Sequence, residues 1–223
     1  MSHQLPRMQS PGLAIFDMDS TLIAMESIDA IASVAGCEAE VAAITEAAMQ
    51  GELDFTEALH ARVAKLAGIP EQTILSMCNH LPFMPGADEL MRWLKHHRWR
   101  IVIVSGGFTW FADEAARRFH ADHVVCNTLE VQNDTLTGKL IGPIVDAKAK
   151  QQTLLSLMRT YHLEPQQVIA VGDGANDIDM IQSAGTGIAF MAKPALQKVA
   201  DFCIQEPNLA LIIPLLSGER STN

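Results

Sequence analysis

Two aspartates end the first apolar run of the chain, and this feature constrains the fold more than any other. The run Leu13 to Phe16 follows Pro11-Gly12 and is typical of a short buried strand. Asp17 and Asp19 come directly after it, at the kind of strand end where open α/β sheets bind ligands. Two carboxylates this close repel each other, so a bound cation would keep both ionised. The alternative is a plain strand-to-helix turn, with the aspartates and Ser20-Thr21 acting as local caps.

Charge and cysteine usage narrow the class of protein. A chain of 223 residues is long enough for one sizeable core and a small insert. Its net charge of -10 argues against nucleic acid or a membrane surface as partner, but is compatible with a small anionic substrate. The four cysteines have no Cys-x-x-Cys spacing, so neither a zinc site nor a disulfide framework is indicated. The N-terminus lacks the apolar core of a signal peptide, and no apolar run approaches the roughly 20 residues of a membrane span. We therefore expect a cytoplasmic protein.

A helical insert is expected directly after the acidic turn. Apolar spacing predicts three helices ended by Gly36, Gly51 and Gly68, followed by a short one at Ile74 to Cys78. No strand-like run occurs in this stretch. The sequence therefore predicts a core formed by residues 1–26 and 81–223, with residues 27–80 inserted as a separate helical unit.

Strands and helices alternate in the rest of the chain, which favours an α/β fold with a doubly wound, mostly parallel sheet. Asn133-Asp134 separates two short apolar runs and predicts a hairpin there. The expected strands are 100–104, 123–126, 129–131, 136–140, 168–171 and 187–190. The expected helices are 87–97, 110–119, 151–161 and 178–183.

Two further groups suited to phosphate follow in this part of the chain. Ser105-Gly106-Gly107 ends the expected strand 100–104, and a hydroxyl with glycine N–H groups can hold a phosphoryl oxygen. A purely structural turn is the alternative. Lys148 and Lys150 precede the expected helix 151–161, and either can direct its ammonium group at a phosphate. The other would be a solvated surface lysine.

A second strand also ends in acids. The expected strand 168–171 runs into Gly172-Asp173-Gly174-Ala175-Asn176-Asp177. This is not an EF-hand loop, because Ala175 and Ala184 occupy positions that require oxygen ligands.

Taken in order, these four motifs resemble those of the haloacid dehalogenase (HAD) superfamily. Its phosphatases carry Asp-x-Asp-x-Thr after the first strand, which Asp17, Asp19 and Thr21 match. A Ser or Thr at a later strand end, a lone Lys at a helix start and Gly-Asp-x-x-x-Asp complete the set. The resemblance implies a Rossmann-like core with the insert as a cap, and it favours Lys150 over Lys148.

The resemblance also implies the roles of individual residues. Asp17 is expected to be the nucleophile and Asp19 the general acid and base. Mg²⁺ is expected to be held by Asp17, the backbone carbonyl of Asp19 and Asp173, with Asp177 as an outer or alternative ligand. The residues expected to bind the phosphate group are Ser105, Gly106, Lys150 and Asn176.

Within the superfamily, residues 19–26 and 49–63 resemble the phosphoserine phosphatases. In that family a Glu receives the substrate ammonium and an Arg its carboxylate, while Met and Phe shield the site. These correspond to Glu26, Arg62, Met49 and Phe55. A zwitterion does need one acid and one base, and guanidinium pairs with carboxylate in a bidentate way. Without the resemblance, a helix-capping Glu and a helix-surface Arg are the commoner fates.

The resulting expectation is Mg²⁺-dependent hydrolysis of O-phospho-L-serine through an aspartyl phosphate. One alternative is a relative that acts on another small phosphomonoester such as phosphohomoserine, or that passes the phosphoryl group to a second alcohol. Another is a phosphate-accepting switch without turnover, which the acid/base Asp19 argues against. With twelve residues before the first strand, no N-terminal regulatory domain is expected. The sequence leaves open whether the protein is a monomer or a homodimer.

Overall fold

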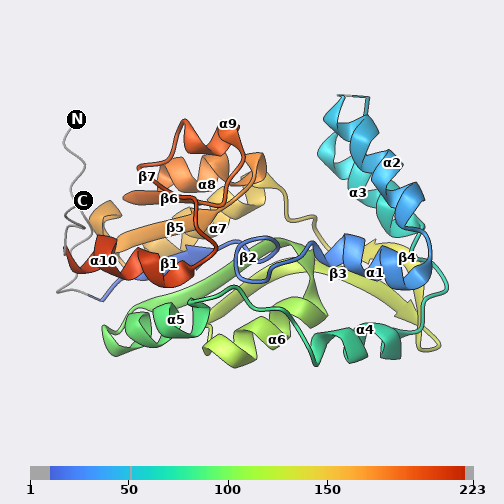
Figure 1. Ribbon diagram of the computed structural model, residues 1–223, viewed down its shortest axis with the longest axis horizontal. Coiled ribbons are helices and arrows are strands. Elements are labelled where there is room, and N and C mark those ends of the chain that lie inside the picture. The colour runs from blue at the N-terminus through green and yellow to red at the C-terminus, as the bar shows by residue number, and fades with distance from the viewer. Residues whose placement is uncertain (1–10, 51, 219–223) are drawn as a thin grey trace.

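The computed structural model describes residues 11–50 and 52–218, and a sheet of seven strands forms the centre of this described part (Figure 1). The strand order is β4-β3-β2-β1-β5-β6-β7, and neighbours run parallel except for β3 and β4. The predicted α/β class with a mostly parallel sheet is confirmed. The strands are β1 (Leu13–Phe16), β2 (Arg100–Phe108), β3 (His123–Gln132), β4 (Thr135–Ile141), β5 (Val168–Gly172), β6 (Thr186–Phe190) and β7 (Phe202–Ile204).

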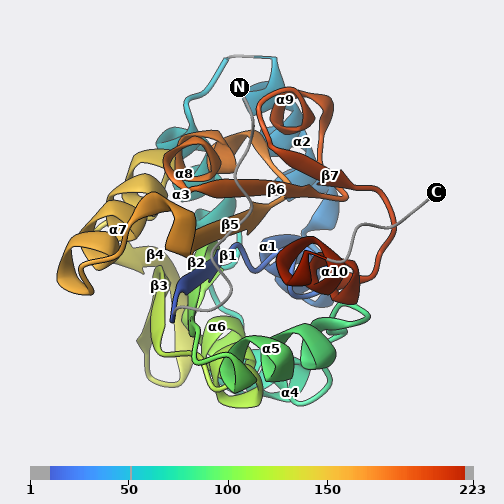
Figure 2. The ribbon, with the colours of Figure 1, turned by 90° about the vertical axis from the view of Figure 1, so that its left-hand side faces the viewer.

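Helices cover both faces of the sheet (Figure 2). Ala14 and Phe16 of β1 face a cluster shared with α5, α6 and α10, whereas Leu13 and Ile15 face a second cluster shared with α7, α8 and α9. Because a central parallel strand is buried on both faces, its sequence is apolar throughout. These helices are α5 (Ala87–His96), α6 (Thr109–Phe119), α7 (Ala147–Thr160), α8 (Ile178–Ser183), α9 (Pro194–Gln197) and α10 (Ile212–Ser217).

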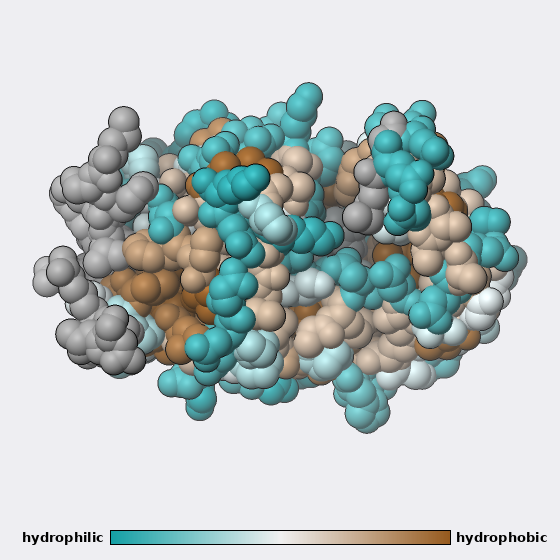
Figure 3. Space-filling model, turned by 45° about the horizontal axis from the view of Figure 1, so that its top comes forward, coloured by the Kyte–Doolittle hydropathy of each residue, from teal (hydrophilic) through white to brown (hydrophobic). Residues whose placement is uncertain are grey.

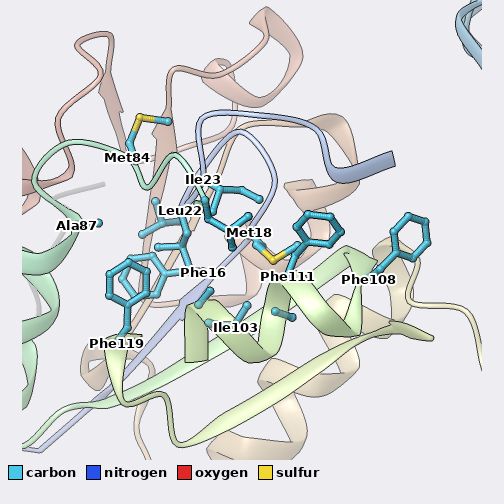
Figure 4. Packing of buried hydrophobic residues seen from close by; sticks show 14 of the residues in the cluster. Phe16, Met18, Leu22, Ile23, Met84, Ala87, Ile103, Phe108, Phe111 and Phe119 are labelled. Atoms are coloured by element: carbon cyan, nitrogen blue, oxygen red, sulfur yellow. The ribbon is translucent and has the colours of Figure 1, made fainter. Parts of the chain in front are cut away.

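The first of these clusters continues beneath the acidic turn (Figure 4). Met18 points into the cluster from between the two aspartates and is fully buried, together with Phe16 and Phe108. Asp17 and Asp19 lie on either side of Met18, directly after the carboxyl end of β1. None of the helices in the described ranges combines the length and the apolar character needed to cross a bilayer.

The predicted helical insert lies between β1 and β2, and within its described residues it contains no strand. Gly36 ends its first helix with φ 71°, a left-handed conformation that suits glycine. The chain leaves and re-enters the core through two paired segments, because Ala24 N–H donates to the Pro82 carbonyl and Met84 N–H to the Leu22 carbonyl, both at 2.8 Å. The helices of the insert are α1 (Ser27–Ala35), α2 (Glu38–Met49), α3 (Phe55–Ala64) and α4 (Glu71–Cys78).

Several boundaries differ from the sequence prediction. Strand β2 does not stop at Val104 but continues through the serine-glycine segment, with a shift of register against β3 between Val104 and Phe108. The two runs expected at 123–126 and 129–131 are one strand, β3. Helix α7 begins four residues earlier than expected, because the Asp146 side chain accepts from Ala149 N–H at 2.8 Å and caps it. Both candidate lysines therefore lie inside α7 and not before it.

The C-terminal elements β7, α9 and α10 were not predicted at all. Strand β7 has 3 residues and α9 has 4, too few for a recognisable period.

Candidate active site

The two acid-ended strands are direct neighbours in the sheet. Phe16 of β1 is in register with Val171 of β5, and Asp17 N–H donates to the Val171 carbonyl at 2.9 Å. Asp17 and Asp173 therefore emerge at one carboxyl edge. The carboxylates of Asp17, Asp173 and Asp177 each offer an oxygen within 4.8 Å of the others, and we call these three residues the carboxylate cluster.

One lysine binds the carboxylate cluster. Lys150 Nζ lies 2.7 Å from Asp17 Oδ2 and 2.7 Å from Asp177 Oδ1, and its side chain is completely buried. Lys148 is exposed on the same helix. The structure therefore places Lys150 at the carboxylate cluster and Lys148 on the exposed surface of the helix.

Asp177 organises the loop after β5. Its Oδ2 accepts from the backbone N–H groups of Asp173 and Gly174, each at 3.2 Å, while its Oδ1 receives Lys150. A Cβ on Gly172 would lie 2.5 Å from the Asp177 side chain, so the close approach requires glycine there. Both oxygens of Asp177 have protein partners, as suits an outer position around a metal ion.

The carboxylate cluster contains three acids and binds one lysine, Lys150. Burial is the largest cause that raises the pKa of Asp17, followed by the charge of Asp177, while Lys150 lowers this pKa. Burial, Asp177 and Glu26 raise the pKa of Asp173 to about 6. Burial lowers the pKa of Lys150, but the two carboxylates beside it raise it more. A divalent cation among these oxygens would relieve the repulsion, and all-oxygen ligands suit Mg²⁺.

Asp19 points away from the carboxylate cluster. Its Oδ2 accepts from the Ser27 hydroxyl at 2.6 Å and from the Ser27 backbone N–H at 3.0 Å, at the start of α1. Within the described part of the chain, its buried Oδ1 has no hydrogen-bond partner. Burial raises the pKa of Asp19 to about 7, although the Ser27 bonds lower it. A carboxyl group held this way can give or take a proton near neutral pH.

The serine-glycine segment of β2 lies beside Asp19. Ser105 is buried, and its hydroxyl accepts from Gly107 N–H at 2.9 Å. A Cβ on Gly107 would lie 2.9 Å from Asp19 Oδ2 and 2.8 Å from the Ser27 hydroxyl, so this backbone packs directly against the acid. Asn176, the remaining candidate phosphate ligand, is half-buried in the 3₁₀ turn after Gly174.

Two positioning residues were missed from the sequence. Ser27 fixes Asp19, as described, and Asn127 fixes the segment around Gly106. The Asn127 side chain donates to the Gly106 carbonyl at 2.8 Å and accepts from Val145 N–H at 2.9 Å. A polar residue that interrupts the apolar pattern of β3 was the available signal for Asn127. Ser27 carried none, because serine at a helix start is common.

The residues expected to select the substrate are less buried. Arg62 on α3 donates from Nε to the Ala58 carbonyl at 3.3 Å. Burial lowers the pKa of Arg62, and the charges of Asp29 and Glu26 raise it by less. Glu26 is exposed, and Oε1 accepts from the Ser20 hydroxyl at 2.6 Å. Glu26 occupies the N-cap position of α1, but among the described residues its side chain makes no capping hydrogen bond to that helix.

Two shielding residues were also expected. The Phe55 ring reaches toward the serine-glycine segment, with Cζ 3.7 Å from the position of a Cβ built on Gly106. The side chain of Met49 lies outside the described residues. In the space-filling view, hydrophilic residues cover much of the outward surface of α2 and α3, and a hollow lies between these helices and the part of the core that carries α8 and α9 (Figure 3).

Comparison with known proteins extends this picture. The family model described as haloacid dehalogenase-like hydrolase matches residues 14–182. The phosphoserine phosphatase of Idiomarina loihiensis is 49% identical over 93% of this chain and 94% of its own length. The phosphoserine phosphatase of Mycobacterium tuberculosis is 47% identical over 93% of this chain, which spans 51% of that relative. A solved structure described as a phospho-aspartyl intermediate analogue of phosphoserine phosphatase has a TM-score of 0.85 and 37% identity, over 92% of this chain and 98% of its own.

Proposed function

Since this chain belongs to the haloacid dehalogenase-like hydrolase family, we propose that it is a phosphoserine phosphatase, which hydrolyses O-phospho-L-serine to L-serine and phosphate. One observation carries the proposal. Asp17 and Asp173 follow neighbouring strands, and their carboxylates lie with that of Asp177 at the buried Lys150, an arrangement suited to a metal ion and a phosphate group. The product L-serine places the enzyme in serine biosynthesis.

Asp17 is the nucleophile in this proposal. Its carboxylate forms a bond to phosphorus while the bond from phosphorus to the serine oxygen breaks, and Asp19 gives its proton to that oxygen. Asp19 then takes a proton from water, which attacks the aspartyl phosphate and releases phosphate. The pKa of Asp19, raised to about 7 by burial, suits a group that must serve in both directions. The Ser27 bonds hold it in one orientation for both steps.

Lys150 and the carboxylate cluster prepare the site for an anion. Lys150 neutralises part of the charge of Asp17, so that a phosphate group is less strongly repelled. We assign Mg²⁺ to Asp17, the backbone carbonyl of Asp19 and Asp173, with Asp177 outside this set. When bound, the ion supplies positive charge that offsets the repulsion between carboxylate and phosphate. Ser105, Gly106 and Asn176 bind the phosphoryl oxygens together with Lys150.

The insert of residues 27–80 is the cap that selects the substrate. Within it, Arg62 pairs with the substrate carboxylate, and Met49 and Phe55 shield the site. Glu26, the last core residue before the insert, receives the ammonium group. Support comes from the partial burial of Arg62, since a guanidinium taken out of water gains from a bidentate carboxylate partner. The cytoplasm is the proposed location. The cysteines at 37, 78, 126 and 203 are all free thiols, which suits a reducing compartment.

Steady-state phosphate release tests the proposal. The panel contains O-phospho-L-serine, O-phosphoethanolamine, phosphoglycolate and phosphohomoserine, each with Mg²⁺ and with excess chelator. The proposal predicts Mg²⁺-dependent release that is fastest from O-phosphoserine. Adding homoserine as a second acceptor should leave the yield of free phosphate unchanged. Preference for another ester would assign a different phosphatase, and formation of a new phosphoester would assign a phosphotransferase.

A further inference from the structure

The β3–β4 hairpin contacts the insert, although it belongs to the opposite end of the sheet from β5 and β6. Gly68 N–H donates to the Leu136 carbonyl and Leu136 N–H donates to the Ile69 carbonyl, both at 2.9 Å. Glu71 N–H donates to the Asp134 carbonyl, also at 2.9 Å. The connection between α3 and α4 is therefore bound to β4 by backbone hydrogen bonds, in addition to the two covalent linkers of the insert.

Gly138 of β4 brings the hairpin against the end of α3. A Cβ at this position would lie 3.0 Å from Ala67 Cβ, 3.1 Å from the Ala64 carbonyl oxygen and 3.3 Å from Ala64 Cα. Gly138 also has φ +80°, a conformation that other residues adopt at a cost. The absence of a side chain thus lets β4 lie directly on the backbone of the α3 terminus.

The other end of α3 lies near the serine-glycine segment at the carboxyl edge of the sheet. Phe55, its first residue, reaches toward Gly106 in the serine-glycine segment. Arg62 lies two residues before Ala64, close to the end that Gly138 contacts. Helix α3 therefore spans from the phosphate-binding segment to the hairpin, and a shift at the hairpin end moves Arg62 more than it moves the phosphate-binding segment.

We propose that the β3–β4 hairpin is a specificity element of this enzyme, with Gly138 as the positioning residue that sets where α3 holds Arg62. The inference rests on the proposed function, in which Arg62 pairs with the substrate carboxylate. Helix α4 is fixed to the core as well, since Trp110 Nε1 of α6 donates to Glu71 Oε1 at 3.1 Å. The hairpin thus acts on substrate choice through α3, and it leaves the carboxylate cluster untouched.

Two glycine variants separate the contact with α3 from backbone strain. Gly138→Ala introduces a Cβ against α3. Gly142→Ala, at φ +79° in the turn after β4, introduces one with nothing within 4 Å. The measured quantity is kcat/KM for O-phosphoserine divided by kcat/KM for O-phosphoethanolamine, which lacks the carboxylate. This ratio does not depend on the fraction of folded enzyme.

We expect Gly138→Ala to lower the ratio by up to about 10-fold, mainly through KM for O-phosphoserine, because the close contacts call for a smaller shift than the 1 Å misplacement that costs about 100-fold. Gly142→Ala should keep the wild-type ratio. Ala67→Val approaches the same contact from the α3 side without a left-handed glycine, and it should lower the ratio in the same direction even where Gly138→Ala does not fold. A wild-type enzyme without preference for O-phosphoserine would contradict the proposed function. A wild-type preference that Gly138→Ala, or Ala67→Val in its place, leaves unchanged would overturn the hairpin inference alone.

Discussion

The carboxylate cluster and helix α3 hold their charged groups in different ways. Lys150 is fully buried between Asp17 and Asp177, and every one of these groups is fixed by the core. Arg62, in contrast, is partly buried and makes one backbone bond within its own helix. The difference indicates that the chemistry is set before substrate arrives, whereas selection depends on the position of one helix. The experiments below test this division, beginning with the largest expected effect.

Asp17→Asn should abolish turnover on every phosphomonoester, because an amide does not attack phosphorus at a useful rate. Circular dichroism and the thermal midpoint show whether the fold is kept. A folded Asp17→Asn enzyme with near-normal phosphate release would exclude the aspartyl-phosphate mechanism.

Asp19→Asn should slow turnover by about 10²–10⁴-fold, the usual size of lost general acid and base catalysis. The loss should be similar for substrates with and without a carboxylate, because Asp19 acts on the bridging oxygen common to all of them. Rapid-quench measurement of the aspartyl phosphate distinguishes the two steps. A loss confined to O-phosphoserine would mean that Asp19 acts in substrate selection and not in proton transfer.

Lys150→Met and Lys148→Ala remove the same charge from the same helix. Removing the buried partner of two carboxylates should cost about 3–5 kcal/mol in the free energy of unfolding, measured by urea without Mg²⁺. The exposed Lys148 should contribute within about 0.5 kcal/mol. Equal effects would mean that Lys150 does not hold the carboxylate cluster together.

Mg²⁺ should stabilise the protein more at high pH than at low pH. Burial raises the pKa values of Asp17, Asp19 and Asp173 in the folded protein above the ordinary value of 3.8, the last two to about 7 and about 6. The folded metal-free protein therefore binds more protons than the unfolded chain, and its stability falls as pH rises from about 4 to about 7.

A bound cation offsets this loss, so the rise in the thermal midpoint on adding Mg²⁺ should be larger at pH 8 than at pH 5. Each kcal/mol corresponds to about 2–4 °C for a chain of this size. Asp173→Asn is the control, and it should reduce the gain. A gain in the thermal midpoint that is the same at both pH values would show that the carboxylate cluster does not bind the metal ion.

The acidic strand ends of the active site could be predicted from the sequence because their signals are local. Apolar runs that stop in Asp17 and Asp173 define two strand ends, and parallel strands bring such ends to one edge. The choice between Lys148 and Lys150 needed the correct start of helix α7. Two residues apart, the lysines lie on different sides of that helix, and the sequence prediction placed its start too late. The Asp146 cap decides that start.

Contacts between segments that are distant in the sequence could not be predicted. Asn127 interrupts an apolar strand, but the sequence does not show that its side chain binds the Gly106 and Val145 backbone. The same holds for Gly138. A glycine in a strand is consistent with a bulge, a bend or a close approach, and the sequence does not name its neighbour in α3.

The division between chemistry and selection is tested most directly by Arg62→Ala, assayed on O-phosphoserine and O-phosphoethanolamine. Loss of the guanidinium leaves the substrate carboxylate without its partner, which is worth about 2–5 kcal/mol, or about 30- to several-thousand-fold in kcat/KM. We predict a loss of this size on O-phosphoserine and activity within a few-fold of wild type on O-phosphoethanolamine. Equal losses on the two substrates would contradict the account and assign Arg62 to the folding or closure of the insert.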